Sequence, residues 1–314
     1  EGIVRCIKSR SGDLAFEGNT DRSELYKING TSLEHFKIGE RLNIKNEKEI
    51  IEKLVEAGDD FIGLEDPDIW IDEKNNLMHV YFTIPIISKN KNKKEKAKIH
   101  LGHAVGKDLN SLEMTLPVLL GGGKLRAKEV SIAPVNKQGF RYNLIESKDR
   151  STGISYSVVQ VAVAEDMGKP WKYGEIVFHP KEHNLSWIAS HASPGPLFSK
   201  NFIDVGEGKL LGIINGCEAN QKVGDKIKYG NFSIGLFVYD YENGKIDWVL
   251  DNPLIQDSEA GKGGNRAITF ASQFIETGKG EGILCAHVDD SFVRAYTLKA
   301  ELLKTILPAK FIKK

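Results

Sequence analysis

The strongest constraint on the fold is a repeated unit of two strands joined by a turn. Four such units begin at Asp66, Glu129, Ser193 and Ala267, spaced by roughly 60 to 75 residues, and a less regular unit precedes them. Each unit turns through Gly, Asn or Asp residues and continues with a second pair of strands rich in β-formers. About five repeats of four strands predict an all-β fold with one domain over residues 1–314. The expected architecture is a five-bladed β-propeller with four-stranded blades around a central funnel. A β-sandwich is the structural alternative, but it does not explain the similar openings.

Helical signals are scarce. One amphipathic helix is predicted over residues 46–57, with Asn46 as its N-cap and Gly58 as its stop. A second short helix is predicted over residues 299–307. Neither helix is large enough to change the all-β assignment.

Charge and cysteine content limit the classes of partner. The 314 residues include 43 basic and 43 acidic side chains, so nothing favours a nucleic-acid or membrane-surface partner. No run of about 18 apolar residues predicts a membrane span. The three cysteines, Cys6, Cys217 and Cys285, are far apart and are expected to be reduced structural thiols. The compartment stays open: a cytoplasmic location is slightly favoured, and a secreted or periplasmic one applies if a leader preceded Glu1.

Carboxylates gather at the opening of the second unit, in the stretch Glu65-Asp66-Pro67-Asp68. Pro67 has no backbone donor and fixes its own φ, so Asp66 is expected at a strand entrance rather than inside a ladder. Acidic side chains at that point, with an apolar hairpin behind them, suit general acid/base chemistry. The alternative is a turn whose acids face water or cap neighbouring N–H groups. In a propeller the first strand of each blade lines the funnel, so Asp66, Glu129 and Ser193 would converge there.

Five motifs in order resemble glycoside hydrolase family 130, which contains β-mannoside phosphorylases and β-mannosidases. Glu65-Asp66-Pro67 with Tyr81-Phe82-Thr83 resembles the first of them. The others are the stretches 192–197 with 210–216, 229–240, 251–254 and 286–291. The related clan of families 43, 32, 68 and 117 shares the five-bladed propeller that this resemblance implies. The motifs cover roughly residues 60 to 300.

The resemblance implies roles for particular residues. Asp66 takes the position of the general acid, and Asp290 takes the position that holds sugar hydroxyls where the bond breaks. Phosphorylases of that family bind phosphate with basic residues, but here Asp68 and Glu146 stand at two of those positions. Two acids would repel a phosphate dianion. The sequence therefore favours water as the nucleophile.

The resulting hypothesis is an inverting glycosidase that acts on a β-mannoside-like bond. Asp66 is the acid, and Glu146 or Glu129 is the base that activates water. Inverting enzymes hold their two carboxyl groups roughly 6.5–9.5 Å apart. Each glutamate also has a structural interpretation: Glu129 could pair with Lys128 or Arg126, and Glu146 with Arg141 or Arg150.

Further substrate-binding residues are predicted, and His191 among them could equally be a structural histidine. No cofactor and no metal site are expected. The expected partner is an oligosaccharide or glycoside, and oligomerisation is left open. The predicted substrate-binding residues are Glu65, Asp68, Arg141, His191, Ser193, Asp289 and Asp290.

Three alternatives to hydrolysis of a mannoside stay open. The first is a glycoside phosphorylase that uses inorganic phosphate. The second is a furanosidase of the related clan, in which Asp66 would be a supporting carboxylate and Asp13 or Asp21 the base. The third is a propeller that binds sugar without turnover.

Overall fold

The computed structural model describes residues 1–32, 35–89, 97–123, 125–151, 153–262 and 266–312. Strands dominate this part of the chain, and α-helix is confined to two short segments. The chain divides into two compact units. Unit 1 comprises Glu1–Gly12, Asn19–Val130 and Ala164–Tyr173, and unit 2 comprises Asp13–Gly18, Ser131–Val163 and Gly174–Lys314. The prediction of a single domain stays a prediction.

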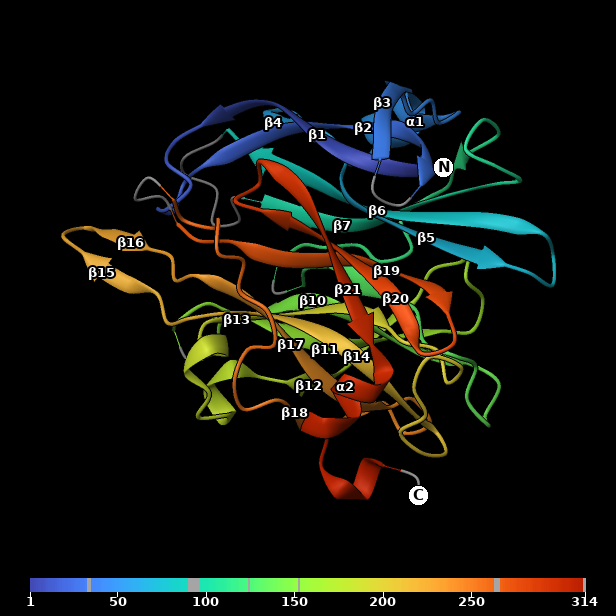
Figure 1. The fold of residues 1–314 in the computed structure, drawn as a ribbon. Coiled ribbons are helices and arrows are strands. Elements are labelled where there is room, and N and C mark those ends of the chain that lie inside the picture. The colour runs from blue at the N-terminus through green and yellow to red at the C-terminus, as the bar shows by residue number, and fades with distance from the viewer. Residues whose placement is uncertain (33–34, 90–96, 124, 152, 263–265, 313–314) are drawn as a thin grey trace. The chain divides into compact units, whose positions relative to one another are not determined.

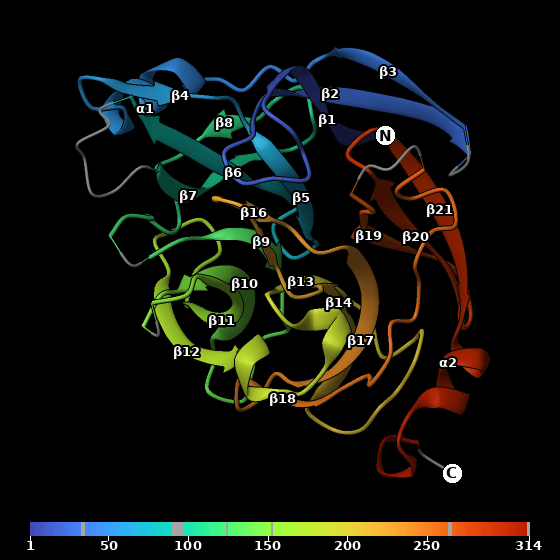
Figure 2. The same cartoon turned by 90° about the vertical axis from the view of Figure 1, so that its left-hand side faces the viewer.

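Unit 1 contains two antiparallel sheets. In the first, three strands follow chain order and lie side by side in both views (Figures 1 and 2): β1 (Gly2–Ser11), β2 (Thr20–Ser32) and β3 (His35–Arg41). In the second, β6 pairs with β4, β5 and β7, and β7 pairs with β8. Its strands are β4 (Asp59–Phe61), β5 (Glu65–Asp72), β6 (Leu77–Ser88), β7 (Ala97–Gly106) and β8 (Glu113–Met114).

The second sheet of unit 1 packs through one face of β6, on which alternate side chains are apolar. Val80, Phe82 and Ile84 on β6 are wholly buried and belong to one core cluster with Leu25 of β2. Helix α1 (Glu47–Leu54) adds Ile50 and Ile51 to the same core. Fully burying side chains of this size contributes about 1.5–3 kcal/mol each. The hydrophobic core of unit 1 therefore holds β5 in place along one edge of β6.

Unit 2 contains a large sheet and two smaller ones. The large sheet runs in the order β18-β17-β14-β13-β11-β10, with β12 paired to β11. Its strands are β10 (Arg141–Asp149), β11 (Tyr156–Ala164), β12 (Lys172–Phe178), β13 (His191–Leu197), β14 (Lys209–Cys217), β17 (Phe232–Asp240) and β18 (Lys245–Val249). Strand β9 (Lys128–Ser131) begins in unit 1 and ends in unit 2, and the first residue of β10 follows a Gly139 turn.

The smaller sheets of unit 2 lie later in the chain. A two-stranded hairpin pairs β15 (Gln221–Val223) with β16 (Lys226–Lys228), and a three-stranded sheet holds β19 (Thr269–Gly278), β20 (Glu281–Val288) and β21 (Phe292–Lys299). Helix α2 (Ala300–Ile306) follows β21 directly (Figure 1). Its Leu303 packs with Phe198 and Leu284 in the main apolar cluster of the unit.

The structure confirms the predicted strand–turn–strand openings. Asp66 lies in β5, Glu129 in β9 and Ser193 in β13, and Ala267 comes just before β19. The two predicted helices are present but shorter than expected, and Asn46 sits at the start of α1 without a side-chain cap hydrogen bond.

The expected blade architecture is confirmed only in part. Strands β5 to β8 follow chain order, as do β13, β14, β17 and β18, whereas β1–β3 and β19–β21 form sheets of three. The strand pairing therefore does not confirm five blades or four strands in each blade. Among the described residues, no helix is long and apolar enough to cross a membrane.

Candidate active site

Asp66 occupies a β-bulge near the start of β5. Glu65 pairs with Thr83 and Asp68 pairs with Tyr81, so β5 has one residue more than β6 between these two pairs. Asp66 has a φ of 49° in the left-handed region, which non-glycine residues seldom adopt. Such a conformation costs of the order of 1 kcal/mol or more and recurs at functional sites. The sequence prediction of Asp66 at a strand entrance is confirmed.

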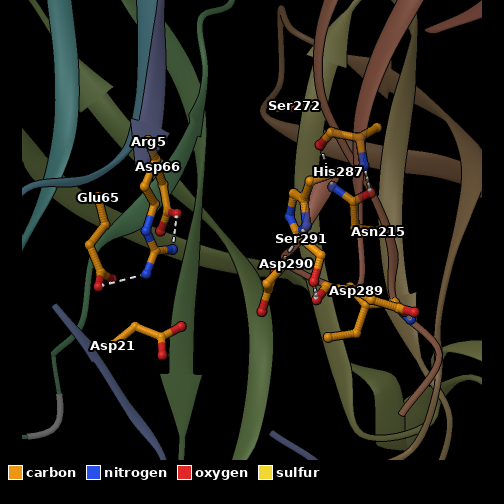
Figure 3. A network of polar contacts seen from close by, with 12 residues as sticks. Arg5, Asp21, Glu65, Asp66, Asn215, Ser272, His287, Asp289, Asp290 and Ser291 are labelled. Atoms are coloured by element: carbon orange, nitrogen blue, oxygen red, sulfur yellow. Dashed lines mark hydrogen bonds and ion pairs between the residues drawn. The ribbon is translucent and has the colours of Figure 1, made fainter. Parts of the chain in front are cut away.

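Arg5 of β1 joins the two carboxylates of the acidic stretch. Its Nη1 donates to Asp66 Oδ1 at 2.9 Å, its Nη2 donates to Glu65 Oε1 at 2.8 Å, and its Nε donates to Ser23 Oγ at 2.8 Å (Figure 3). The side chains of Glu65 and Asp66 are each 13% exposed. Because the planar guanidinium of Arg5 donates from all three nitrogens, it fixes the orientation of the two carboxylates and also offsets their negative charge.

Lys128 of β9 lies between Asp66 and Glu129. Its Nζ is 3.2 Å from Asp66 Oδ2 and 3.4 Å from Glu129 Oε1. The separation of Asp66 Oδ2 and Glu129 Oε1 cannot exceed these two distances combined, which places this pair of oxygens at or below the lower limit of roughly 6.5 Å for an inverting pair. Glu129 has a φ of 49°, the same left-handed conformation as Asp66. The predicted ion pair between Glu129 and Lys128 is present.

The neighbouring Glu65 holds its proton unusually tightly. Burial raises the pKa of Glu65 to about 7, and the charges of Asp66 and Asp21 add to the rise, while Arg5 and Lys128 oppose it. Close to neutral pH, the carboxyl group of Glu65 is therefore protonated in a large share of molecules. Two adjacent carboxyl groups with different surroundings are a common basis for acid/base chemistry.

Asp21 of β2 lies beside this cluster (Figure 3). It is 8% exposed, and its two carboxylate oxygens accept hydrogen bonds from Arg10 Nε and Nη2 at 2.7 and 2.8 Å. Asp13, the other candidate base of a furanosidase, belongs to unit 2 and accepts from the backbone N–H of Ala15. Asp68 lies on β5 opposite Tyr81.

In unit 2, Glu146 contacts a histidine. His191 Nε2 lies 2.9 Å from Glu146 Oε2. The Glu146 side chain is wholly buried, whereas that of His191 is 22% exposed. The ring of His191 packs edge-on against Phe232, with ring centroids 4.8 Å apart. The imidazole of His191 is the part of this pair that reaches the surface.

Two other candidates of unit 2 are buried or bound to backbone. Ser193 on β13 is wholly buried, and its Oγ has no hydrogen-bond partner within the described ranges. Arg141 on β10 donates from its guanidinium to the carbonyl oxygen of Ala133. Neither observation assigns or removes a role in sugar binding.

The last candidates follow β20. Asp289 accepts hydrogen bonds from the backbone N–H groups of Ile268 and Gly261, each at 2.8 Å. Asp290 Oδ1 lies 2.9 Å from His287 Nδ1, and its side chain is 24% exposed. Asp289 thus stabilises the backbone at Gly261 and Ile268, while the carboxylate of Asp290 lies beside the imidazole of His287.

Asn215, close to the same residues, stabilises a strand contact. Its Oδ1 accepts from the backbone N–H of Ala271 at 2.8 Å, and its Nδ2 donates to the carbonyl oxygen of Ala271 at 3.1 Å. The side-chain amide of Asn215 is wholly buried, and its oxygen and nitrogen are both hydrogen-bonded, so it links β14 to β19 in the way that a pair of backbone hydrogen bonds would.

Sequence reasoning missed Arg5, Ser23 and His287. Arg5 lies 61 residues from Asp66, and no local pattern marks it. His287 stands in a quoted motif, but its pairing with Asp290 depends on the left-handed conformation of Asp290, with a φ of 48°. Within the described ranges, no group of three or more His, Cys, Asp or Glu side chains could hold a metal ion.

Comparisons with known proteins locate the fold. Neither family models nor curated proteins match the sequence. One solved structure belongs to work stating that "the GH130 family of mannoside phosphorylases contains glycoside hydrolases that target beta-1,2 mannosidic linkages in Candida mannan". It is 16% identical, the match covers 93% of this chain and 78% of that one, and the TM-score is 0.63. The chain has the fold of glycoside hydrolase family 130.

Two further solved structures extend the likeness across the clan. A mannose phosphorylase from Leishmania mexicana, solved with a phosphate ion, is 14% identical, and the match covers 90% of this chain and 77% of that one with a TM-score of 0.50. A GH32 β-fructofuranosidase from Bombyx mori is 12% identical, with coverage of 84% and 48% and a TM-score of 0.52. The expected likeness to family 130 and to the propeller glycosidase clan is confirmed at the level of the fold.

Proposed function

We propose that the protein is a glycosidase that hydrolyses a β-mannoside-like bond with inversion of configuration, and that Asp66 is its general acid. The observation that carries this proposal is the conformation and fixation of Asp66. Its left-handed backbone at a bulge is held by Arg5 on one side and Lys128 on the other. The fold in which this occurs is otherwise found in glycoside hydrolases and phosphorylases.

The proposed reaction transfers two protons. Asp66 donates a proton to the glycosidic oxygen as the bond between that oxygen and the anomeric carbon breaks. A water molecule attacks the opposite face of the sugar and gives a proton to the base. The products are two free sugars, and the proton taken by the base returns to Asp66 through solvent.

Glu129 is the base that the contacts of unit 1 favour. It belongs to the same unit as Asp66, and Lys128 contacts both carboxylates. Glu146 stays the second candidate, although its side chain is wholly buried and contacts His191 in this structure.

Water is the proposed nucleophile because the cations near Asp66 already face carboxylates. Arg5 contacts Glu65 and Asp66, and Lys128 contacts Asp66 and Glu129. A phosphate dianion would have to compete with two carboxylates for each cation. A β-mannoside is proposed because the solved structure with a TM-score of 0.63 comes from work on β-1,2-mannosidic linkages.

A furanosidase is a second candidate, and Asp21 is the observation in its favour. Of Asp13 and Asp21, the two aspartates that a furanosidase would offer as base, Asp21 is the one that lies in the same cluster as Glu65 and Asp66. Its pairing with both donors of Arg10 argues against a base that must release a proton to solvent.

The test compares Asp66→Asn with the intact protein on aryl glycosides and mannobioses. The expected result is a loss of activity of at least about 100-fold on unactivated substrates, with an unchanged circular dichroism spectrum. Proton NMR identifies the anomer that is released first, and this anomer should have the inverted configuration. The matched control is Asp225→Asn, in the exposed turn between β15 and β16, which should retain full activity.

Three outcomes would overturn parts of the proposal. Full activity in Asp66→Asn would remove Asp66 as the acid. Preferential turnover of arabinofuranosides or fructofuranosides would favour the furanosidase. Calorimetric binding of a mannobiose without turnover of any glycoside would point to a sugar-binding protein that is not an enzyme.

A further inference from the structure

Arg5 on β1 contacts the carboxylates of both Glu65 and Asp66. Its three donors are divided among Asp66, Glu65 and Ser23 at 2.8–2.9 Å. Its side chain is only 25% exposed. Because β1 and β5 both belong to unit 1, this arrangement does not depend on how the two units are placed.

The charges around Glu65 are few and come from four strands. Arg5 lies on β1, Asp21 on β2, Asp66 on β5 and Lys128 on β9. Of these, Arg5 and Lys128 also contact Asp66 directly. The charge of Glu65 therefore acts on Asp66 both through space and through the guanidinium that they share.

We propose that Arg5 and Glu65 are positioning residues for Asp66: Arg5 fixes the direction of the Asp66 carboxylate, and the charge of Glu65 sets how tightly Asp66 holds its proton. This inference rests on the proposed function, in which Asp66 is the acid. Neither residue needs to touch the substrate for the effect. The physical basis is that a guanidinium shared by two carboxylates neutralises each of them less completely than a guanidinium that contacts a single carboxylate.

The direction of each effect follows from charge. A negative Glu65 makes Asp66 hold its proton more tightly, so removing that charge makes Asp66 release its proton at lower pH. Removing the positive charge of Arg5 does the opposite. A general acid must be protonated to act, so these changes move the alkaline limb of the pH profile of kcat/KM in opposite directions.

The test uses three variants with pH profiles measured on an aryl glycoside and on a mannobiose. Where the alkaline limb lies above about pH 7, Glu65 is ionised, and Glu65→Gln should move the limb to lower pH by roughly one unit, the size expected for a neighbouring charge. Arg5→Met should move it to higher pH and lower kcat more than it changes KM. Arg5→Lys should restore the limb to its original place without restoring kcat, because an ammonium group cannot hold two carboxylates and a hydroxyl in one plane.

Controls separate this role from general stabilisation. Glu113→Gln and Arg41→Met change the same residue types at exposed ion pairs of unit 1 and should leave the pH profile in place. If Glu65→Gln and Arg5→Met lower the midpoint of thermal unfolding while the alkaline limb stays where it was, both residues are only structural, and the proposal is wrong. Shifts of the two variants in the same direction would also overturn it.

A second measurement is independent of turnover. Carbon-13 NMR of the side-chain carboxyl groups follows the titration of Asp66 in the intact protein, in Glu65→Gln and in Arg5→Met. Opposite shifts of the Asp66 titration support the inference, and an unchanged titration overturns it. If no glycoside is turned over by the intact protein, the proposed function fails, and the NMR titration still decides whether Glu65 and Arg5 control Asp66.

Discussion

The guanidinium of Arg5 donates a hydrogen bond to the Asp66 carboxylate at 2.9 Å, although 61 residues separate them along the chain. This contact connects β1 to the bulge of β5. The charges alternate in sign from Arg5 through Asp66 and Lys128 to Glu129. The direction of the proposed acid therefore depends on a strand in which no motif was found. The contact also explains how a left-handed backbone at Asp66 can be held at one conformation.

The first prediction concerns the base. Glu129→Gln should lower kcat by about 100-fold or more, because water would lose its proton acceptor, and added azide should restore part of the activity as a glycosyl azide. Glu146→Gln should have a smaller effect on kcat, since its carboxylate is wholly buried. Steady-state kinetics with and without azide make the measurement. Azide rescue in Glu146→Gln but not in Glu129→Gln would exchange the two assignments.

The second prediction concerns phosphate. Because Arg5 and Lys128 each already face two carboxylates, inorganic phosphate should neither raise the rate nor appear in the product. Phosphorus-31 NMR of the reaction mixture distinguishes free phosphate from a sugar 1-phosphate. A sugar 1-phosphate that forms in proportion to turnover would identify a phosphorylase instead.

The third prediction is a dependence of stability on pH through Glu65. Its pKa of about 7 lies above the ordinary value of 4.5, so the folded protein holds this proton more tightly than the unfolded chain. The resulting stabilisation is complete below about pH 4.5 and is lost as the pH rises through 7. The loss is at most about 1.4 kcal/mol for each pH unit in that window.

Glu65→Gln removes this loss. Urea denaturation at pH 5 and at pH 7.5 should show a smaller difference in the free energy of unfolding for Glu65→Gln than for the intact protein. Glu113→Gln, at an exposed pair with Lys45, is the matched control and should behave like the intact protein. Identical differences for all three proteins would refute the assignment of a proton to Glu65.

The fourth prediction concerns a buried histidine pair in unit 1. His79 Nδ1 and His103 Nε2 are 2.9 Å apart, and His103 Nδ1 lies 2.8 Å from Thr115 Oγ1. The Thr115 hydroxyl donates to the carbonyl oxygen of Leu116, so it accepts from His103 Nδ1, and His103 Nε2 accepts from His79 Nδ1. This chain of donors and acceptors requires a neutral His103, because a protonated His103 has no nitrogen left to accept from His79.

Burial accordingly lowers the pKa of His103 to about 3, with the neighbouring His79 adding to the effect and Asp166 opposing it. Stability from the neutral pair is present above pH 6.5 and is lost as the pH falls from 6.5 toward 3, the opposite sign to Glu65. His103→Gln should be less stable at pH 7.5 but lose less stability on acidification to pH 5. Urea denaturation at both values checks this. A loss on acidification as large as that of the intact protein would contradict it.

Local patterns predicted much of the secondary structure. The strand–turn–strand openings, the position of Asp66 at a strand entrance before Pro67, and the two helices follow from propensity and turn chemistry, which act within a few residues. The pairing of Glu129 with Lys128 was also open to prediction, because these residues are adjacent.

Long-range contacts could not be predicted in the same way. The sequence around Glu146 offered Arg141 and Arg150 as partners, whereas the contact of Glu146 with His191 joins residues 45 positions apart and has no local signal. Likewise, Asp289 and Asp290 are adjacent in the chain, yet one caps backbone N–H groups and the other contacts His287. Two neighbouring side chains with left-handed backbones can point in different directions, and only the surrounding strands decide which.

The sequence by itself determined that the chain is a succession of strand–turn–strand units with a carboxylate at the mouth of the second unit, because alternation, turn residues and Pro67 act locally. Only the tertiary structure decided that Arg5 and Lys128 hold that carboxylate and that Glu65 is buried enough to keep a proton near neutral pH. The physical reason is that the strength of a charge interaction depends on distance and on the exclusion of water. Both are set by strands that lie far apart in the sequence.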